Sequence, residues 1–548
     1  MTTIETHATS APATSGSGLA GIAEWVTTTD HKRIGRLYLV AAALAFIAAG
    51  VVGVLLGIER ISPTRDWLPV GSLTQLFSLE RFGLTYLALA PLMVGLAIAI
   101  VPLQLGARSL AFPRLAAAGF WAWLIGAGLA VYSVVLDGGP GGEKRMYELF
   151  VLSTVLVLAG LLAGVVSVAT TILTARAPGM NLRRVPFFTW SVLVASVAAV
   201  VALPVLIGDL LYLFTANHYI SDSALQGNSA FGEWVGFGFS QPTTLLFAIP
   251  VLGLLAETVA TGTGRRLRPR GIVFMGIGLA GVAVLATVLQ RPATLRPAFL
   301  DLGLGDVLSD LAPYALVHLL PLLGAFIALA LAAKGLVSKP KISAQLVFAL
   351  FAALVLVGAF AVNALVHIGD AGLIGTVAEE GNWLAVVFAA VLAAMGAVSY
   401  WAPKWWGRSL PLKATLPLAL LAFAGAELAS LSLVVAGFAD QPGSAFPLIE
   451  EAARNSQVGF DYSGPMGLWN TLNAVGIGLV VVAVLAFVLL ALKTFTGSGD
   501  AVGDDPWDGH TLEWATTSPA PFANFADVHI VQSAEPLLDL KPSNRSDA

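Results

Sequence analysis

Apolar stretches of about twenty residues recur along this chain, and they constrain its fold more than any other feature. Each is bounded by Gly, Pro or charge and is long enough for a helix to cross about 30 Å of hydrocarbon. The twelve stretches are residues 36–58, 83–106, 116–136, 148–174, 187–215, 239–261, 271–290, 312–333, 342–368, 382–402, 411–439 and 468–493. They lack the strict alternation of β-barrel strands, so the sequence predicts an all-α integral membrane bundle of twelve transmembrane helices.

Composition excludes several other classes of protein. With 57% hydrophobic and only 11% charged residues among 548, the chain is not a water-soluble globule. Cysteine is absent, which excludes disulfides, iron–sulfur clusters and thiolate-bound zinc, so any metal must be held by His or carboxylates. The net charge of −4 and the lack of a basic stripe argue against a nucleic-acid partner.

The charge distribution predicts how the chain is organised. Residues 1–20 are small and polar, without the charged and apolar regions of a signal peptide, and we expect a disordered tail there. Residues 21–495 form the predicted membrane domain, and residues 496–548 the C-terminal tail. Most Lys and Arg lie in the N-terminal segment, the even-numbered loops and the tail, which places both termini in the cytoplasm by the positive-inside rule.

Several motifs resemble one known family. The entry to the first helix, Trp25–Tyr38, and the stretches Pro102–Gly106, Phe188–Ser191, Tyr400–Lys404 and Asp505–Pro519 are similar to heme–copper oxidase subunit I, the catalytic subunit of cytochrome c oxidase. The resemblance covers nearly the whole chain. It implies the twelve-helix fold of that family, a bacterial plasma membrane location, and oxygen reduction with proton translocation. It also implies a low-spin heme with two axial His, a high-spin heme with one, and a copper with three.

The histidine inventory conflicts with that implied chemistry. The chain has seven histidines: His7, His31, His218, His318, His367, His510 and His529. Glu80 stands where the family's second helix supplies a heme ligand, and Gln241 stands at the copper ligand of its sixth helix. The family's His-Phe-His motif, which ligates both hemes, falls on Gly381 and Trp383. We therefore predict no heme, no copper and no catalytic residue.

Other positions that the resemblance marks as functional are also changed. The region expected to carry a His-His pair for copper reads Val288–Ala293, and a proton-uptake Asp is replaced by Ser109. The Arg pair that would hold heme propionates aligns with Asp440 and Gln441. Lys334 is comparable with a second uptake channel's Lys, but we place it at a cytoplasmic helix end.

Among the remaining histidines, His318 and His367 fall near the outer ends of two different spans. We interpret them as interfacial or hydrogen-bonded structural residues, and a relocated metal site is the alternative. His31 and His510 belong to cytoplasmic motifs, where capping or interface packing is expected.

Acids at membrane depth are candidates for function. Glu427 and Asp209 lie within apolar stretches, where an unpaired ionised carboxylate is costly. Each is either functional, or protonated and hydrogen-bonded, or close to an interface. Glu80 and Arg81 are expected to form an adjacent interfacial pair within reach of water.

Three functions follow from these patterns. The first is a degenerate subunit I paralogue without heme or copper, retained for assembly or regulation and partnered by membrane lipid and respiratory oxidase subunits or assembly factors. The second is a proton, ion or small-molecule transporter that uses the emptied bundle, with Glu427 or Asp209 in its path. The third is a working terminal oxidase subunit, which needs ligands that are not at their positions.

Overall fold

The structure is a computed structural model, and it describes most of the chain. The described residues are 23–61, 67–139, 142–219, 242–289, 293–296, 299–301, 303–443, 465–498, 501–525, 527 and 530–540. The predicted N-terminal tail and Gln241 lie outside them.

Twelve helices in the described ranges are long and apolar enough to cross a membrane, which confirms the predicted fold class. Single helices form the spans α2 (His31–Glu59), α5 (Pro113–Val135), α6 (Lys144–Thr174), α7 (Phe187–Tyr219), α16 (Ala344–Val366), α17 (Val377–Trp406) and α18 (Leu412–Gly437). The other spans join shorter elements, namely α3 (Val70–Phe82), η1 (Gly83–Leu89) and α4 (Ala90–Gln104); α10 (Pro242–Ala248) and α11 (Pro250–Thr263); α12 (Arg270–Ala280), η2 (Gly281–Ala283) and α13 (Val284–Leu289); α14 (Leu304–Tyr314), η4 (Ala315–Leu319) and α15 (Leu320–Leu336); and α20 (Met466–Lys493) and η6 (Thr494–Ser498).

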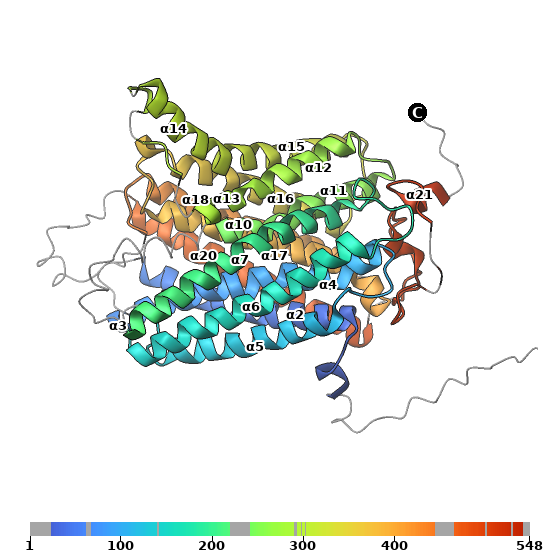
Figure 1. Ribbon diagram of the computed structural model, residues 1–548, viewed down its shortest axis with the longest axis horizontal. Helices are drawn as coiled ribbons and strands as arrows, with labels where there is room; N and C mark the ends of the chain where they lie inside the picture. The colour runs from blue at the N-terminus through green and yellow to red at the C-terminus, as the bar shows by residue number, and fades with distance from the viewer. Residues whose placement is uncertain are drawn as a thin grey trace, which may run out of the picture.

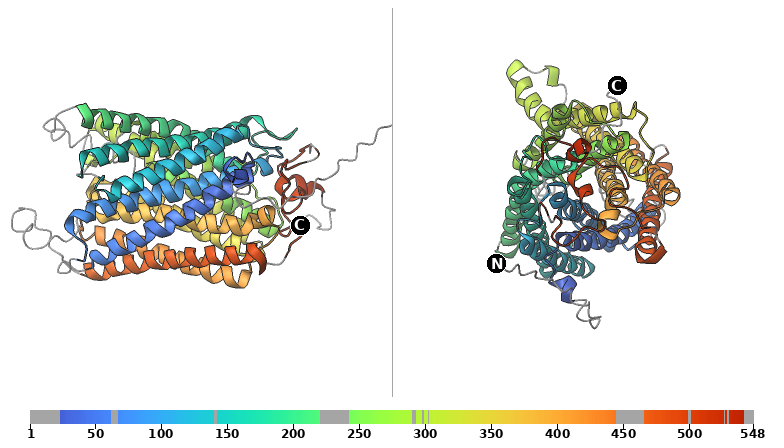
Figure 2. Two further views of the ribbon diagram at one scale, coloured as in Figure 1. Left: turned by 90° about the horizontal axis from the view of Figure 1, so that it is seen from below. Right: turned by 90° about the vertical axis from the view of Figure 1, so that its right-hand side faces the viewer.

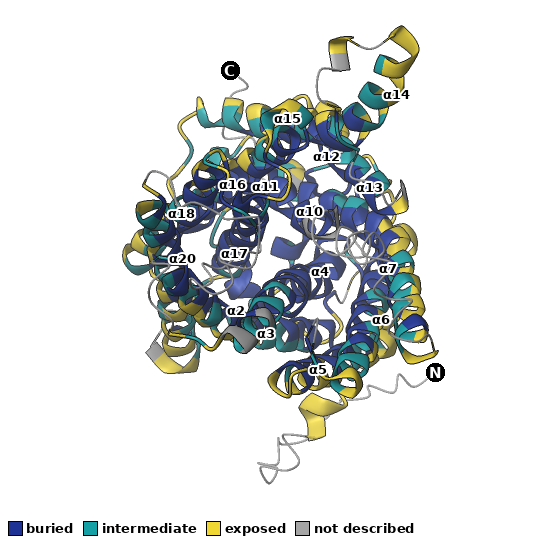
Figure 3. Ribbon diagram, turned by 90° about the vertical axis from the view of Figure 1, so that its left-hand side faces the viewer, coloured by how far each residue is buried: buried dark blue, intermediate teal, exposed yellow. Residues whose placement is uncertain are grey.

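Three spans form the centre of the bundle. The helices run along the longest axis of the molecule (Figure 1), and an end-on view places α4, α10 and α17 in the middle with the others around them (Figure 3). In Gln75–Gln104, Leu245–Thr263 and Val377–Trp406, 94–100% of the most apolar window is buried, against 39–61% in the other spans. Polar groups on these three spans are therefore shielded from lipid by protein.

Small residues allow the helices to approach closely. Gly119 on α5 faces Gly160 on α6, and a Cβ at Gly119 would lie 2.6 Å from the Gly160 carbonyl oxygen. Without a side chain at such positions, the backbones themselves form the contact, as is common between membrane helices.

The start of α2 and the C-terminal tail lie at the same end of the bundle (Figures 1 and 2). We call this the tail end, and the opposite end, which holds Glu59 and Val377, the far end. The His31 imidazole joins the two segments, because Nδ1 hydrogen-bonds the Ile98 carbonyl and Nε2 the Asn524 amide, each at 3.0 Å. This packing agrees with the structural role expected for His31.

One predicted boundary is wrong in a way that matters for the site. The second span begins at Gln75 and not at residue 83, because α3 continues through η1 into α4 without a break. Glu80 and Arg81 consequently lie inside the span, although adjacent charges are typical of a helix end.

Candidate functional site

Glu80 and Trp383, which the sequence resemblance predicts to stand at heme-ligand positions, lie on neighbouring spans near the far end. Glu80 is on α3 and Trp383 is on α17, and both side chains are buried. The indole Nε1 of Trp383 donates a hydrogen bond to Thr85 Oγ1 at 2.9 Å, which ties α17 to the helix of Glu80. The guanidinium of Arg81 lies 5.3 Å from the centre of the Trp383 ring. Gly381, two residues before Trp383, packs so closely on α18 that a Cβ would lie 2.6 Å from the Ser430 carbonyl oxygen.

A buried ion pair stands beside these positions. Arg60 donates two parallel hydrogen bonds to Glu380, at 2.6 and 2.8 Å, and the two side chains are only 2% and 4% exposed. Glu380 lies in the first turn of α17 and Arg60 caps the end of α2, so each charge also complements a helix dipole. The paired geometry is the strong form of a guanidinium–carboxylate contact.

Glu80 extends this pair into a network of four charges, which we call the far-end network: Arg60, Glu80, Arg81 and Glu380. Arg81 Nη2 lies 3.8 Å from Glu380 Oε2, and Glu80 interacts electrostatically with the other three groups. The prediction that Glu80 and Arg81 lie within reach of water is wrong for Glu80, which is 2% exposed.

The position aligned with a propionate-binding Arg belongs to the same region. Gln441 is buried, and its Nε2 donates to Asn470 Oδ1 at 3.0 Å. Asn470 Nδ2 in turn donates to the Arg60 carbonyl at 2.9 Å. A neutral amide thus connects the loop after α18 to the far-end network.

His318 and His367 come together although they lie on different helices. Their rings stack with centres 4.3 Å apart and planes 22° from parallel. Asn363 contacts both, since its Nδ2 hydrogen-bonds His318 Nδ1 at 3.0 Å and its carbonyl hydrogen-bonds His367 Nδ1 at 2.7 Å. Burial lowers the pKa of His367, which favours the neutral ring. Among the described residues, no group of three or more His, Asp or Glu side chains is arranged to hold a metal.

The membrane-depth acids Asp209 and Glu427 lie elsewhere. Asp209 is on α7 and Glu427 is on α18, and both side chains are half-buried rather than enclosed in the central helices. The structure brings neither of them next to the far-end network.

A second polar cluster closes the tail end, and the sequence analysis missed it. We call Gln104, Glu257, Tyr400, Lys404 and Glu513 the tail-end cluster. Glu513 lies in η7 (Leu512–Ala515) of the tail and accepts hydrogen bonds from Gln104 Nε2 at 3.0 Å and Trp401 Nε1 at 3.2 Å. Glu257 Oε2 accepts from the backbone N–H of Phe187 at 3.0 Å.

Lysine and tyrosine side chains complete this cluster. Lys404 is fully buried, and its Nζ donates to the carbonyls of Asp504 and Thr516, both at 2.8 Å. Tyr400 Oη lies 2.8 Å from Thr261 Oγ1. Glu257 was detectable in sequence as an acid in an apolar stretch, whereas the burial of Glu513 depends on how the tail docks.

Comparison with known proteins decides the family. The family described as Cytochrome C and Quinol oxidase polypeptide I matches residues 33–477. The chain belongs to this family. It is 26% identical to cytochrome c oxidase subunit 1 of Bacillus sp. (strain PS3) over 93% of this chain and 83% of the relative. It is 27% identical to the probable cytochrome c oxidase subunit 1-beta of Nocardia farcinica over 96% of this chain and 90% of that relative.

A solved structure supports the same fold. A chain of a heme–copper terminal oxidase dimer matches with a TM-score of 0.59 at 15% identity, covering 92% of this chain and 88% of that one. This subunit I homologue is therefore a multi-pass membrane protein with the family's twelve-helix architecture.

The residues present do not fit the hemes and copper that the resemblance implies. Heme iron and copper in a dry interior need imidazole, thiolate or thioether donors, but the far-end network offers carboxylates and guanidinium groups, and the neighbouring Trp383 offers an indole.

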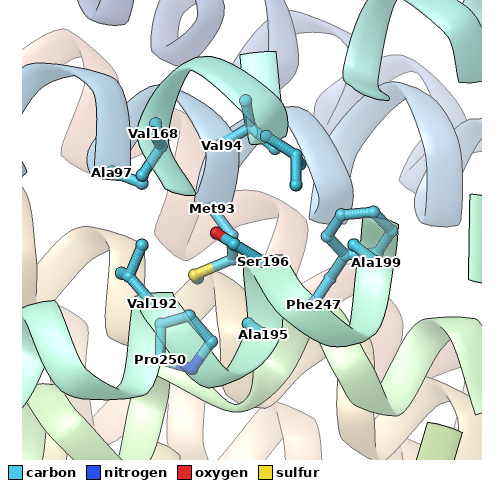
Figure 4. A pocket seen from close by; sticks show the side chains of 11 residues that line it. Met93, Val94, Ala97, Val168, Val192, Ala195, Ser196, Ala199, Phe247 and Pro250 are labelled. Carbon is cyan, nitrogen blue, oxygen red and sulfur yellow. The ribbon is translucent and has the colours of Figure 1, made fainter. Parts of the chain in front are cut away.

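The interior beside the sixth span is also closely packed. A cavity of about 20 Å³ lies between α4, α6, α7, α10 and α11, lined by Met93, Ser196, Phe247 and Pro250 among mostly aliphatic side chains (Figure 4). That volume holds roughly one water molecule. Phe247 and Pro250 of the sixth span point into this small apolar space (Figure 4).

Proposed function

We propose that this protein is a subunit I homologue that binds neither heme nor copper and does not reduce oxygen. It acts as a non-catalytic membrane partner in the assembly or regulation of a respiratory oxidase. The observation that carries the proposal is the far-end network, in which the buried carboxyl of Glu80 stands at the expected ligand position beside the Arg60–Glu380 pair. Trp383, at the other ligand position, is held by Thr85.

A carboxylate and an indole cannot replace two axial imidazoles. Moreover, Arg60 and Glu380 satisfy each other through both guanidinium–carboxylate hydrogen bonds. Separating them for a ligand would leave an uncompensated buried charge, which costs several kcal/mol. The region thus supports a structural use of these positions.

The experiment is an optical spectrum with pyridine extraction for heme and elemental analysis for copper on protein purified in mild detergent. The subunit I of Bacillus subtilis, 26% identical, serves as the control in the same detergent. We expect the control to contain heme and copper and this protein to contain neither. Stoichiometric heme would overturn the proposal and reopen the oxidase alternative.

The partner part of the proposal needs a separate test. Affinity purification from membranes should recover an oxidase subunit, a cytochrome or an oxidase assembly factor together with this chain. Recovery of the chain alone at the same yield would contradict the assembly or regulatory role while leaving the cofactor result intact. Both termini are proposed to face the cytoplasm of a bacterial plasma membrane, and protease access to the tail in inverted vesicles tests that orientation.

The transporter alternative rests on Glu427 and Asp209. Their half-buried positions outside the three central spans give it less support than the far-end network gives to the first proposal. In liposomes, Glu427→Gln should change proton or ion flux if the alternative is correct, and unchanged flux would eliminate this version of it.

A further inference from the structure

A large apolar groove opens at the tail end between α2 and α20. It has a volume of about 460 Å³ and is lined by aliphatic and aromatic side chains of α2, α17 and α20, with Leu92 from α4. This volume lies in the range of about 300–1,000 Å³ that is usual for small-molecule sites. The three helices are neighbours in the end-on view (Figure 3).

The groove exists because α2 and α20 separate toward the tail end. Nearer the far end the helices touch through small residues: a Cβ at Gly57 would lie 2.9 Å from the Ala474 Cβ. Gly50 packs on Val481. From there toward the tail end, the residues of α2 and α20 that face each other line the groove. Val40, Leu44 and Leu492 on its walls are 58–61% exposed, so the groove faces the lipid side of the bundle.

The length of the groove matches one leaflet. It follows α20 from Val484 to Leu492, a rise of about 12 Å at 1.5 Å per residue, and continues along η6 to Thr496. Half of the hydrocarbon core is about 15 Å. A chain that enters at the tail-end surface therefore reaches the middle of the membrane.

A cation stands at the mouth of this apolar groove. Arg36 lines it, and its guanidinium lies 5.2 Å from the Trp25 ring centre and 5.8 Å from that of Trp406. Tryptophans at this depth are typical of the headgroup level of a membrane. Asp30 is the acid that interacts with Arg36, but its carboxylate pairs with Lys32 Nζ at 3.0 Å. Arg408 lies close by and donates to the Thr494 carbonyl at 3.3 Å.

We propose that this groove binds one anionic phospholipid, with an acyl chain between α2 and α20 and the phosphate on Arg36. Basic pockets between membrane helices recognise anionic headgroups in this manner. The apolar walls supply affinity for the chain, and Arg36 supplies selectivity for negative charge.

The test uses delipidated full-length protein and native mass spectrometry, with phosphatidylglycerol or phosphatidylcholine of identical acyl chains as the probe. We expect one phosphatidylglycerol to remain bound where phosphatidylcholine does not. Arg36→Gln should weaken that binding about five-fold. Lys334→Gln is the matched control, because it removes the same charge from an exposed residue in the last turn of α15, away from the groove.

A second variant tests the acyl chain. Ala43→Phe fills the groove from its α2 wall, where Ala43 is only partly buried, and should abolish the bound lipid while Lys334→Gln retains it. If Ala43→Phe does not fold, phosphatidylglycerol binding by Arg36→Gln, compared with Lys334→Gln, decides whether the proposal holds. Equal binding of both lipids with no effect of Arg36→Gln would overturn the proposal. Displacement of phosphatidylglycerol by a neutral isoprenoid quinone would also overturn it and assign the groove to an isoprenoid chain.

Discussion

The hydrogen bonds and ion pairs described for the buried polar residues differ between the two ends of the bundle. At the far end, the guanidinium groups of Arg60 and Arg81 face the carboxylate of Glu380, and the buried Glu80 interacts electrostatically with all three groups. At the tail end, Glu513 is held by neutral donors from Gln104 and Trp401, and Lys404 donates to backbone carbonyls.

The residues of the tail end belong to the motifs that carry the family resemblance. Gln104 is from Pro102–Gly106, Lys404 from Tyr400–Lys404 and Glu513 from Asp505–Pro519, and these three stretches meet at the docked tail. The retained motifs thus serve the docking of the tail. A strong resemblance at these motifs therefore predicts the fold and gives little information about cofactor chemistry at the far end.

The largest effect is expected from breaking the far-end pair. Arg60→Gln leaves the buried Glu380 with only the longer contact to Arg81 and should destabilise the protein by about 3–5 kcal/mol. Thermal unfolding in detergent measures the change. The double variant Arg60→Met with Glu380→Met should recover most of the loss, because replacing both members of a buried pair is often neutral or stabilising. Equal stability of Arg60→Gln and the parent would contradict the described pairing.

The next effect is expected at the tail end and should remain local. Lys404→Met leaves the carbonyls of Asp504 and Thr516 without their donor, at a cost of about 1.5–3 kcal/mol. Hydrogen exchange should accelerate in residues 504–516 and not in α4 or α17. Lys413→Met, at an exposed site, is the control. Uniform acceleration throughout the bundle would show that the two ends are not independent.

A smaller effect is expected from Trp383→Phe. The variant loses the hydrogen bond to Thr85 but keeps a ring for Arg81, so we expect about 1 kcal/mol of destabilisation. Trp67→Phe, at an exposed position, should change the free energy of unfolding far less. A loss as large as that of Arg60→Gln would assign the main structural role to the indole.

The smallest expected effect is a pH dependence of tail docking. Burial raises the pKa of Glu513 despite its hydrogen bonds, so the docked state binds more protons than the released state. Docking should therefore weaken as the pH rises from the released-state pKa of about 4.3 through the docked-state pKa. Glu513→Gln should flatten this dependence, measured as protection of residues 512–515 against exchange. A steeper pH dependence of docking in Glu513→Gln would show that Glu513 opposes this trend instead of causing it.

Local sequence patterns were sufficient for the twelve spans but not for the site. Hydropathy located every span, because the apolar character of a span depends only on the residues within it. The start of the second span was wrong because adjacent charges at Glu80 and Arg81 are typical of a helix end, and only the fold brings Arg60 and Glu380 beside them. Substitution at Glu80 and Trp383 was predicted by resemblance, whereas the Arg60–Glu380 and Trp383–Thr85 contacts join residues about 300 positions apart. The enclosed acid Glu513 was missed for the same reason, whereas Glu257 was detectable as an acid in an apolar stretch.

The wide turn that follows Glu80 has a geometric consequence. Over Gly83–Leu89 the helix has π geometry, which accommodates an extra residue relative to an α-helix. One residue corresponds to about 100° of rotation about the helix axis. Deleting a single residue from this segment would turn Glu80 away from Arg60 by about a quarter of a revolution, with every charged residue still present in the sequence. The direction in which this acid points is therefore fixed by the number of residues in a neighbouring turn as well as by their identity.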